Sequence, residues 1–153
     1  MIGRFRQPTG HIEIVAYGTK GAVANSHELC TWIEYVPGYT MFGSCDAVSS
    51  VGKGHPVNVG LEAQIPNPKL GASTEVGGLL APNVASVELR FRRNDRAKAT
   101  VAQVSGKLQR RLKQPAPFGY FVAKIKGLVA AKAIEVRAYD ARGRLLDSTS
   151  GRI

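Results

Sequence analysis

Apolar and polar residues alternate with a period of two along most of this chain, which predicts β-strands with one buried face. Residues 57–65 show the pattern most clearly, with an apolar side chain at every odd position from Val57 to Ile65. The runs are bounded by Gly, Pro, Asn or Asp, which are typical of turns between strands. The strands predicted in this way are residues 11–17, 27–35, 57–65, 87–92, 97–104, 118–125 and 133–139.

Turn signals between these runs indicate how neighbouring strands connect. Residues 93–96 (Arg-Asn-Asp-Arg) and 140–143 (Asp-Ala-Arg-Gly) each separate two strand-like runs, and the second ends on a glycine suited to a left-handed backbone. Helical periodicity is confined to residues 107–113, where Leu108 and Leu112 stand four apart. Many short strands without intervening helices favour a β-sandwich or a barrel. We expect an all-β, antiparallel β-sandwich with little or no helix.

The length of 153 residues suits one domain spanning 1–153. A Pro/Gly-rich stretch over residues 66–83 marks a possible division into two lobes. We prefer one continuous sandwich with a long crossover there, because each half alone would bury only a small core. No run of apolar residues is long enough to predict a transmembrane segment.

The net charge of +10 is concentrated in the second half of the chain. Residues 1–76 hold five basic and six acidic residues, whereas residues 77–153 hold sixteen basic and five acidic. This asymmetry indicates either an anionic partner or a merely solvated face. If two basic clusters converge, their side chains would bind phosphate or carboxylate groups. The candidate residues are Arg90, Arg92, Arg93, Arg96, Arg110, Arg111 and Lys113.

The aromatic residues near these clusters do not favour nucleic acid as the partner. Binding to single strands generally adds exposed aromatics between the basic groups. Phe91 and Phe118 occupy predicted core positions instead. The sequence leaves the partner unknown, with another protein or an anionic cell-surface polymer as the candidates.

The two cysteines, Cys30 and Cys45, predict a disulfide. The bond would close a loop of about 15 residues and stabilise the fold by ~3 kcal/mol in the chain-entropy model. Two buried free cysteines in a cytosolic protein are the alternative. The disulfide favours an extracytoplasmic or secreted protein whose export signal or anchor lies outside this chain, since residues 1–17 contain no signal-peptide apolar segment.

A metal site is not expected at these cysteines. Together with His27 and His55 they provide four groups able to bind zinc. The second close pair of ligands is missing, however, because Cys45 and His55 are far apart in sequence. His27 and Cys30 would also project to opposite faces of a regular strand.

The segment from Tyr35 to Gly43 is expected to be a loop that carries three large apolar side chains, Tyr39, Met41 and Phe42. Held inside the predicted disulfide loop, these side chains are candidates for an apolar contact surface. The alternative is that they cover one end of the core.

No catalytic motif emerges from the sequence. Ser44 lacks the second glycine of a nucleophile elbow, and Lys53 lacks the upstream glycine of a phosphate-binding loop. The three histidines have no paired motif, and no cofactor is expected. A small secreted hydrolase with a histidine and an acidic residue is kept as an alternative.

Residues 87–91, 119–122 and 136–146 together resemble a known type of domain. Val-Glu-Leu-Arg-Phe, Gly-Tyr-Phe-Val and the hairpin Val-Arg-Ala-Tyr-Asp-Ala-Arg-Gly-Arg-Leu-Leu are similar to immunoglobulin-like all-β domains of secreted or membrane-tethered actinobacterial proteins of uncharacterised function. The resemblance covers the second half of the chain. It implies a sandwich and an extracytoplasmic setting, and it supplies no catalytic residues. We therefore expect a non-enzymatic extracytoplasmic interaction module, with the hydrolase and a binder of nucleic acid or anionic polymer as alternatives.

Overall fold

The computed structural model describes the chain except residues 1, 7–11, 21–26, 36–38, 48–50, 53, 66–71, 92–94, 105, 113, 115, 131–132 and 151–153. Side chains are described for Cys45 and for the described residues from 51 onward, apart from residues 61–65.

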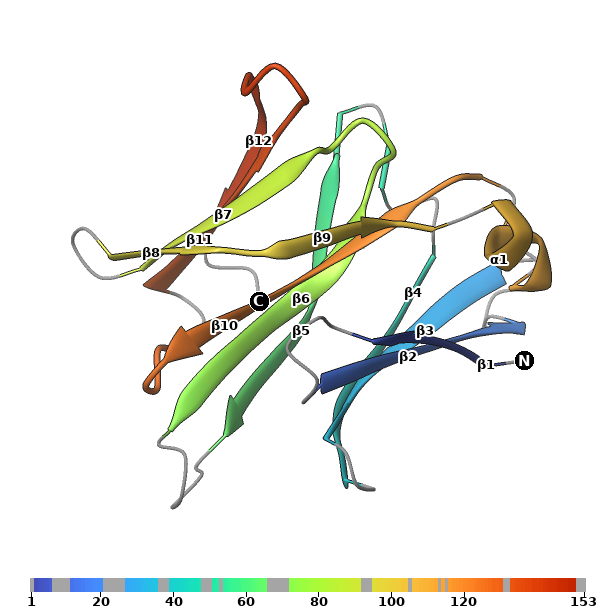
Figure 1. Ribbon diagram of the computed structural model, residues 1–153, viewed down its shortest axis with the longest axis horizontal. Helices are drawn as coiled ribbons and strands as arrows, with labels where there is room; N and C mark the ends of the chain where they lie inside the picture. Colours follow the sequence, from blue (N-terminus) through green and yellow to red (C-terminus); the bar gives the residue numbers. More distant parts are fainter. Residues whose placement is uncertain are drawn as a thin grey trace.

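The described residues form an all-β protein with a single short helix, which confirms the predicted fold class (Figure 1). The strands make three four-stranded antiparallel sheets. The first sheet has the order β1-β2-β3-β4: β1 (Ile2–Arg6), β2 (Ile12–Lys20), β3 (His27–Tyr35) and β4 (Tyr39–Ala47). The second has the order β5-β6-β10-β9: β5 (Val57–Ile65), β6 (Ser73–Leu80), β10 (Gly119–Lys126) and β9 (Thr100–Gln103). The third has the order β12-β11-β7-β8: β12 (Leu145–Ser150), β11 (Ile134–Tyr139), β7 (Ser86–Phe91) and β8 (Asp95–Lys98).

The second and third sheets pack face to face and enclose the main hydrophobic core. Burial alternates along β7 and β11, so that each strand gives one face to the core and one to solvent. Leu89 and Val136, which are register partners, are both almost fully buried. Burying a side chain of this size contributes about 1.5–3 kcal/mol. The other large core residues include Val76, Leu80, Phe121, Ile125 and Ile134.

The helix α1 (Gly106–Arg111) covers a second, smaller apolar cluster at one end of the sandwich. Leu108 of the helix packs against Leu79, Val104, Leu112 and Phe118. The helix begins at Gly106, one residue before the segment 107–113 in which the sequence showed helical periodicity, and it ends within that segment at Arg111. Among the described residues, no helix has the length and apolar content needed to span a membrane.

Residues 73–80 form a central strand, whereas the sequence indicated a Pro/Gly-rich connection there. Every residue of β6 is buried, because both faces of this strand are covered. Alternation is absent in such a strand, which explains why the period-two pattern did not find it. β5 and β6 pair with each other in one sheet on either side of residues 66–71.

A β-bulge interrupts β5 opposite β6. The pairing advances from Val59 to Leu61 while the partner advances only from Gly78 to Gly77, so residue 60 is the extra one. A Cβ atom at Gly78 would collide with the main-chain oxygen of Asn58 and would lie 3.0 Å from Cε1 of Phe121. Glycine at this position therefore permits the close approach of the two strands.

The segment predicted as one strand over residues 97–104 divides between the two layers of the sandwich. β8 pairs with β7 in the third sheet, and β9 pairs with β10 in the second sheet. The change of sheet takes place at Ala99, whose N–H still donates to the carbonyl of Val87 at 2.9 Å. The chain therefore crosses from one layer to the other at this corner of the molecule.

The predicted turn at residues 140–143 is confirmed. Gly143 has a φ of 75°, and its N–H donates to the carbonyl of Asp140 at 3.0 Å. The Asp140 carboxylate also accepts the N–H groups of Arg142 and Arg144, each at 2.9 Å. The turn predicted at residues 93–96 links β7 to β8, although residues 92–94 themselves lie outside the described part of the chain.

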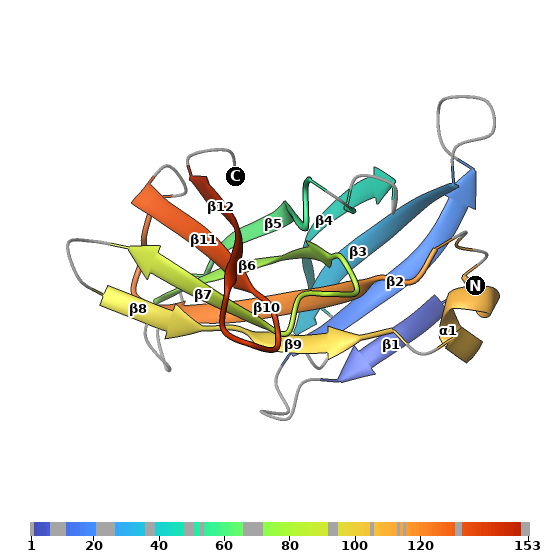
Figure 2. The ribbon, with the colours of Figure 1, turned by 90° about the horizontal axis from the view of Figure 1, so that it is seen from above.

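The first sheet lies toward the same end of the molecule as α1, whereas β7, β8, β11 and β12 lie toward the other end (Figures 1 and 2).

Tyr39, Met41 and Phe42 belong to β4, so the expectation that they sit in a loop is wrong. β4 pairs with β3, with Tyr39 opposite Tyr35. The side chains of these three residues are outside the described set, so the contact surface stays a prediction.

Candidate functional site

The two described residues of the first predicted basic cluster, Arg90 and Arg96, share one acidic partner, Glu88. Arg90 donates from Nε to Oε1 of Glu88 at 2.7 Å, and Nη1 of Arg96 lies 3.8 Å from Oε2 of the same carboxylate. The hydrogen bond from Arg90 holds the pKa of Glu88 below its ordinary value of 4.5. Arg90 is therefore engaged within its own sheet, while the side chain of Arg96 is 61% exposed.

The neighbouring strand repeats the same arrangement. Arg137 donates from Nε to Oε1 of Glu135 at 2.9 Å, and Ser148 donates from Oγ to the same oxygen at 2.6 Å. Both hydrogen bonds lower the pKa of Glu135, and the one from Ser148 has the larger effect. The register sets Arg137 beside Glu88 and Glu135 beside Arg90. The outer face of the third sheet is thus a set of mutually paired charges, which suits a solvated face better than an anion site.

The second predicted cluster lies far from the first. Arg110 and Arg111 are exposed in the last turn of α1. Figures 1 and 2 place α1 and β8 at opposite ends of the molecule, so the two clusters do not converge. The remaining predicted residues, Arg92, Arg93 and Lys113, lie outside the described residues.

A pocket in the described part of the chain lies elsewhere, at the corner where the chain crosses between layers. It is an open groove of about 540 Å³ between β8 and the last part of β10. We call it the edge groove. Its residues are Phe91, Asp95, Arg96, Ala97, Lys124, Ile125, Lys126 and Gly127.

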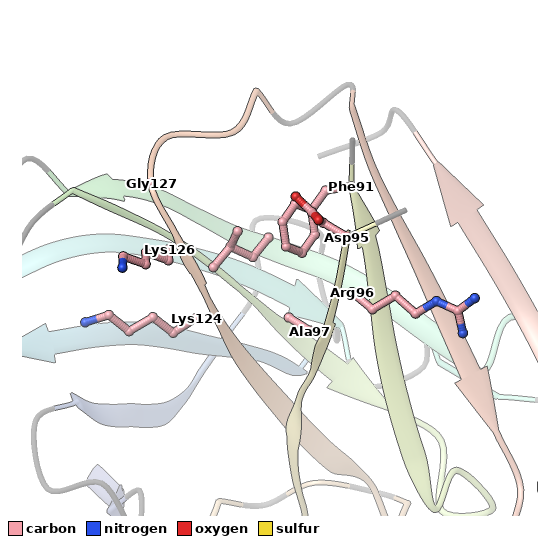
Figure 3. Close-up of a pocket in the computed structure, with 8 residues that line it drawn as sticks. Phe91, Asp95, Arg96, Ala97, Lys124, Lys126 and Gly127 are labelled. Carbon is pink, nitrogen blue, oxygen red and sulfur yellow. The ribbon is translucent and has the colours of Figure 1, made fainter. Parts of the chain in front are cut away.

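The edge groove combines apolar walls with charged rims (Figure 3). Phe91 and Ile125 are almost fully buried and belong to the sandwich core. Lys124 and Lys126 extend in the same direction from β10, and Arg96 extends the opposite way from β8 (Figure 3). The strands that border the groove therefore carry basic side chains that extend away from Phe91 (Figure 3), and Asp95 is the one acidic lining residue.

The edge groove exists because β9 covers only the first half of β10. The register pairs β9 with residues 119–122 of β10 and ends there. Along the second half of β10, Ala123 to Lys126, the sheet pairing of the described residues shows a partner on the β6 side alone. A strand edge of this kind presents main-chain groups to any chain that can lie against it.

Hydrogen-bond direction identifies which main-chain groups face this edge. The N–H of Gly127 donates to Ala72 on the β6 side at 2.7 Å, and the carbonyl of Phe118 accepts Val104 on the β9 side at 3.0 Å. Because directions alternate along an antiparallel strand, residues with even numbers in β10 face the β9 side. The N–H and C=O groups of Lys124 and Lys126 therefore point into the edge groove.

The two lysines differ in their charge environment. Nζ of Lys124 lies 3.5 Å from Oε1 of Glu75, a side chain with no solvent exposure on the neighbouring strand β6. A buried carboxylate requires such compensation, so Lys124 has a structural role. Lys126 is exposed and forms no ion pair with the described residues. Lys126 is therefore a lining cation of the edge groove without an ion-pair partner among the described residues.

The other predicted site residues do not assemble into a catalytic or metal centre within the described part of the chain. His55 is exposed and makes a main-chain bridge with Gly52. Among the side chains that the structure describes, no three histidine, cysteine or acidic residues lie close enough together to bind a metal ion. Cys30 and Cys45 are register partners in adjacent strands, β3 and β4.

Sequence reasoning missed the edge groove. Lys124 lies in a predicted strand. The alternation of residues 97–104 did not indicate, however, that the strand beside β10 would begin only after Ala99 and leave Lys124 without a described neighbouring strand on that side. The basic residues that the sequence favoured form clusters of three or four, whereas Lys126 has only Lys124 close to it in the sequence. No protein-family model, curated protein or solved structure matches this chain.

Proposed function

We propose that this protein is a non-enzymatic, extracytoplasmic interaction module that binds an acidic, extended segment of a partner protein in the edge groove. The observation that carries the proposal is the combination of an exposed lysine, Lys126, with outward-facing main-chain groups beside an apolar wall. Such a site offers charge complementarity on its rim and hydrogen bonds along its floor.

A protein segment suits the edge groove better than an anionic polymer does. Phosphate-rich polymers present acceptors only, whereas the edge of β10 offers both N–H donors and C=O acceptors. The aromatic residue of the groove, Phe91, is 8% exposed and does not provide a stacking platform for bases. Asp95 would also repel a uniformly charged chain.

The extracytoplasmic setting is supported by the cysteine pair. The register places Cys30 directly opposite Cys45, and neighbouring antiparallel strands bring Cα atoms within the range that a disulfide spans. No cysteine among the described residues is free. A disulfide in a small domain is typical of oxidising compartments. The resemblance of residues 87–146 to immunoglobulin-like extracytoplasmic domains agrees with this setting.

Charge reversal at the groove tests the proposal. A fluorescein-labelled peptide in which glutamate alternates with valine is titrated with the protein, and its anisotropy gives the Kd. The substitution Lys126→Glu should weaken binding about tenfold, because it replaces an attraction with a repulsion. Lys124 is left intact, since Glu75 depends on it.

The matched control is Lys107→Glu, an exposed lysine on α1 with the same change of charge. It should leave the Kd within about twofold, because α1 lies at the other end of the molecule. Equal losses in the two variants would show general electrostatic attraction and contradict the proposal. Tighter binding of polyphosphate or a DNA oligomer than of the peptide would also contradict it.

A further inference from the structure

The first half of β10 pairs with β9, which shows how a further strand could pair with the second half. β9 lies antiparallel along residues 119–122, with Val101 opposite Phe121. Val101 points inward and packs against the main core, so this row alternates between core-facing and outward-facing side chains. At Ala99 the chain leaves the row, and among the described residues no other strand continues it beside Lys124 and Lys126.

The continuing row would have a defined register. If the pairing of β9 with β10 ran on, Lys124 would face residue 98 and Lys126 would face residue 96. In the structure these two residues pair with β7 instead, Lys98 with Glu88 and Arg96 with Arg90. Among the described residues, no strand occupies the positions opposite Lys124 and Lys126.

The side chains of β10 determine which residues an added strand should have at the facing positions. Cross-strand neighbours on the same face lie about 4.5–5.5 Å apart at Cβ, which is close enough for ion pairs. A residue opposite Lys126 shares its outward face and should be acidic. A residue opposite Ile125 turns inward, toward Phe91 and Ala97, and should be apolar.

We propose that the partner segment binds by antiparallel strand addition to residues 124–126 of β10, with an acidic residue opposite Lys126 and an apolar residue opposite Ile125. This inference rests on the function proposed above and specifies how the ligand is held. In an antiparallel pair of this register, the residues opposite Lys124 and Lys126 exchange both main-chain hydrogen bonds with them. The N–H groups that donate to β10 therefore belong to the acidic residues of the ligand.

N-methylated peptides test the mode of binding. The alternating glutamate and valine peptide is prepared with methyl groups on the glutamate nitrogens, and a second version carries them on the valine nitrogens. Methylation at glutamate should weaken binding about tenfold or more, because it removes the donors that face β10. Methylation at valine should change the Kd less than about twofold, because those N–H groups point away from β10.

Each outcome separates the two proposals. If the unmodified peptide binds and both methylated versions bind equally well, strand addition is wrong while the proposed function stands. If loss occurs in the valine series instead, the antiparallel register is wrong. If the unmodified peptide does not bind at all, the proposed function itself fails and the inference falls with it.

Amide hydrogen exchange gives a second readout on the protein. The amides of Lys124 and Lys126 face the groove, whereas those of Ala123 and Ile125 face β6. Saturating peptide should slow exchange at the first pair at least about fivefold relative to the second pair. Unchanged exchange at Lys124 and Lys126 would overturn strand addition, even where the peptide binds.

Discussion

At the scale of single residues, Gly78 is the position where the backbone geometry is most demanding. The bulge in β5 brings the Asn58 carbonyl to the place that a Cβ at residue 78 would occupy. We predict that Gly78→Ala lowers the free energy of unfolding by about 2 kcal/mol or more, because the strands must move apart. Urea denaturation followed by circular dichroism measures this loss.

Gly52→Ala is the control for that substitution. A Cβ at residue 52 meets no atom within 4 Å. The change should alter the free energy of unfolding by less than about 0.5 kcal/mol. Equal effects of the two substitutions would show that the close approach at Gly78 does not limit the packing of β5 on β6.

Asp140 gives a prediction about protonation at one residue. The main-chain N–H of Arg144 is the largest cause of a lowered pKa at this carboxyl, and the Arg144 side chain adds to it. Carbon-detected NMR titration should therefore give a midpoint below the ordinary 3.8. In Arg144→Ala the midpoint should rise but stay below 3.8, because the main-chain donors remain. A wild-type midpoint at or above 3.8 would mean that this turn does not form as described.

At the scale of elements, the paired charges on β7 and β11 predict an acid-sensitive sheet. The pKa values of Glu88 and Glu135 are lowered by folding, so both carboxylates stabilise the fold fully above the unfolded value of about 4.5. This contribution is lost as the pH falls through the lowered values. The urea midpoint should therefore decrease between pH 6 and pH 3.

The variant with both Glu88→Gln and Glu135→Gln isolates this effect. Glutamine keeps the shape and some hydrogen bonds of each side chain but does not titrate in this range. The variant should lose less stability than the wild type over the same pH interval. If the two proteins lose equally, the acid sensitivity comes from other carboxyl groups.

The elements also show what sequence reasoning can reach. Period-two alternation found the strands with one buried face, such as β7 and β11, because burial on a single face leaves a visible pattern. It missed β6, where both faces are buried, and it joined β8 to β9, because a change of sheet leaves alternation unbroken. The edge groove follows from that change of sheet, so it was beyond prediction from local pattern.

At the scale of the whole molecule, the cysteine pair would join β3 to β4. If the disulfide forms, replacing both residues in Cys30→Ser/Cys45→Ser should cost about 3 kcal/mol, because the unfolded chain gains freedom in a loop of about 15 residues. Thermal denaturation of the two proteins without reductant measures the difference. Two titratable thiols per chain in the denatured, unreduced wild type would contradict the disulfide.

The arrangement of the whole sandwich accounts for the position of the proposed ligand site at a corner. A closed barrel leaves no strand edge, whereas a sandwich leaves edges that other chains can extend. Here the crossing at Ala99 closes one part of the corner and leaves the end of β10 uncovered by the described strands. The net charge of +10 favours approach of an acidic segment, and the proposal assigns its binding position to the exposed Lys126.

The most direct measurement is an NMR titration of the labelled protein with the alternating glutamate and valine peptide. We predict that amide shifts are confined to residues 95–97 and 124–127, on the two sides of the edge groove. Shifts centred on residues 106–111 of α1, or no shifts at millimolar peptide, would contradict the assignment of this groove as the binding site.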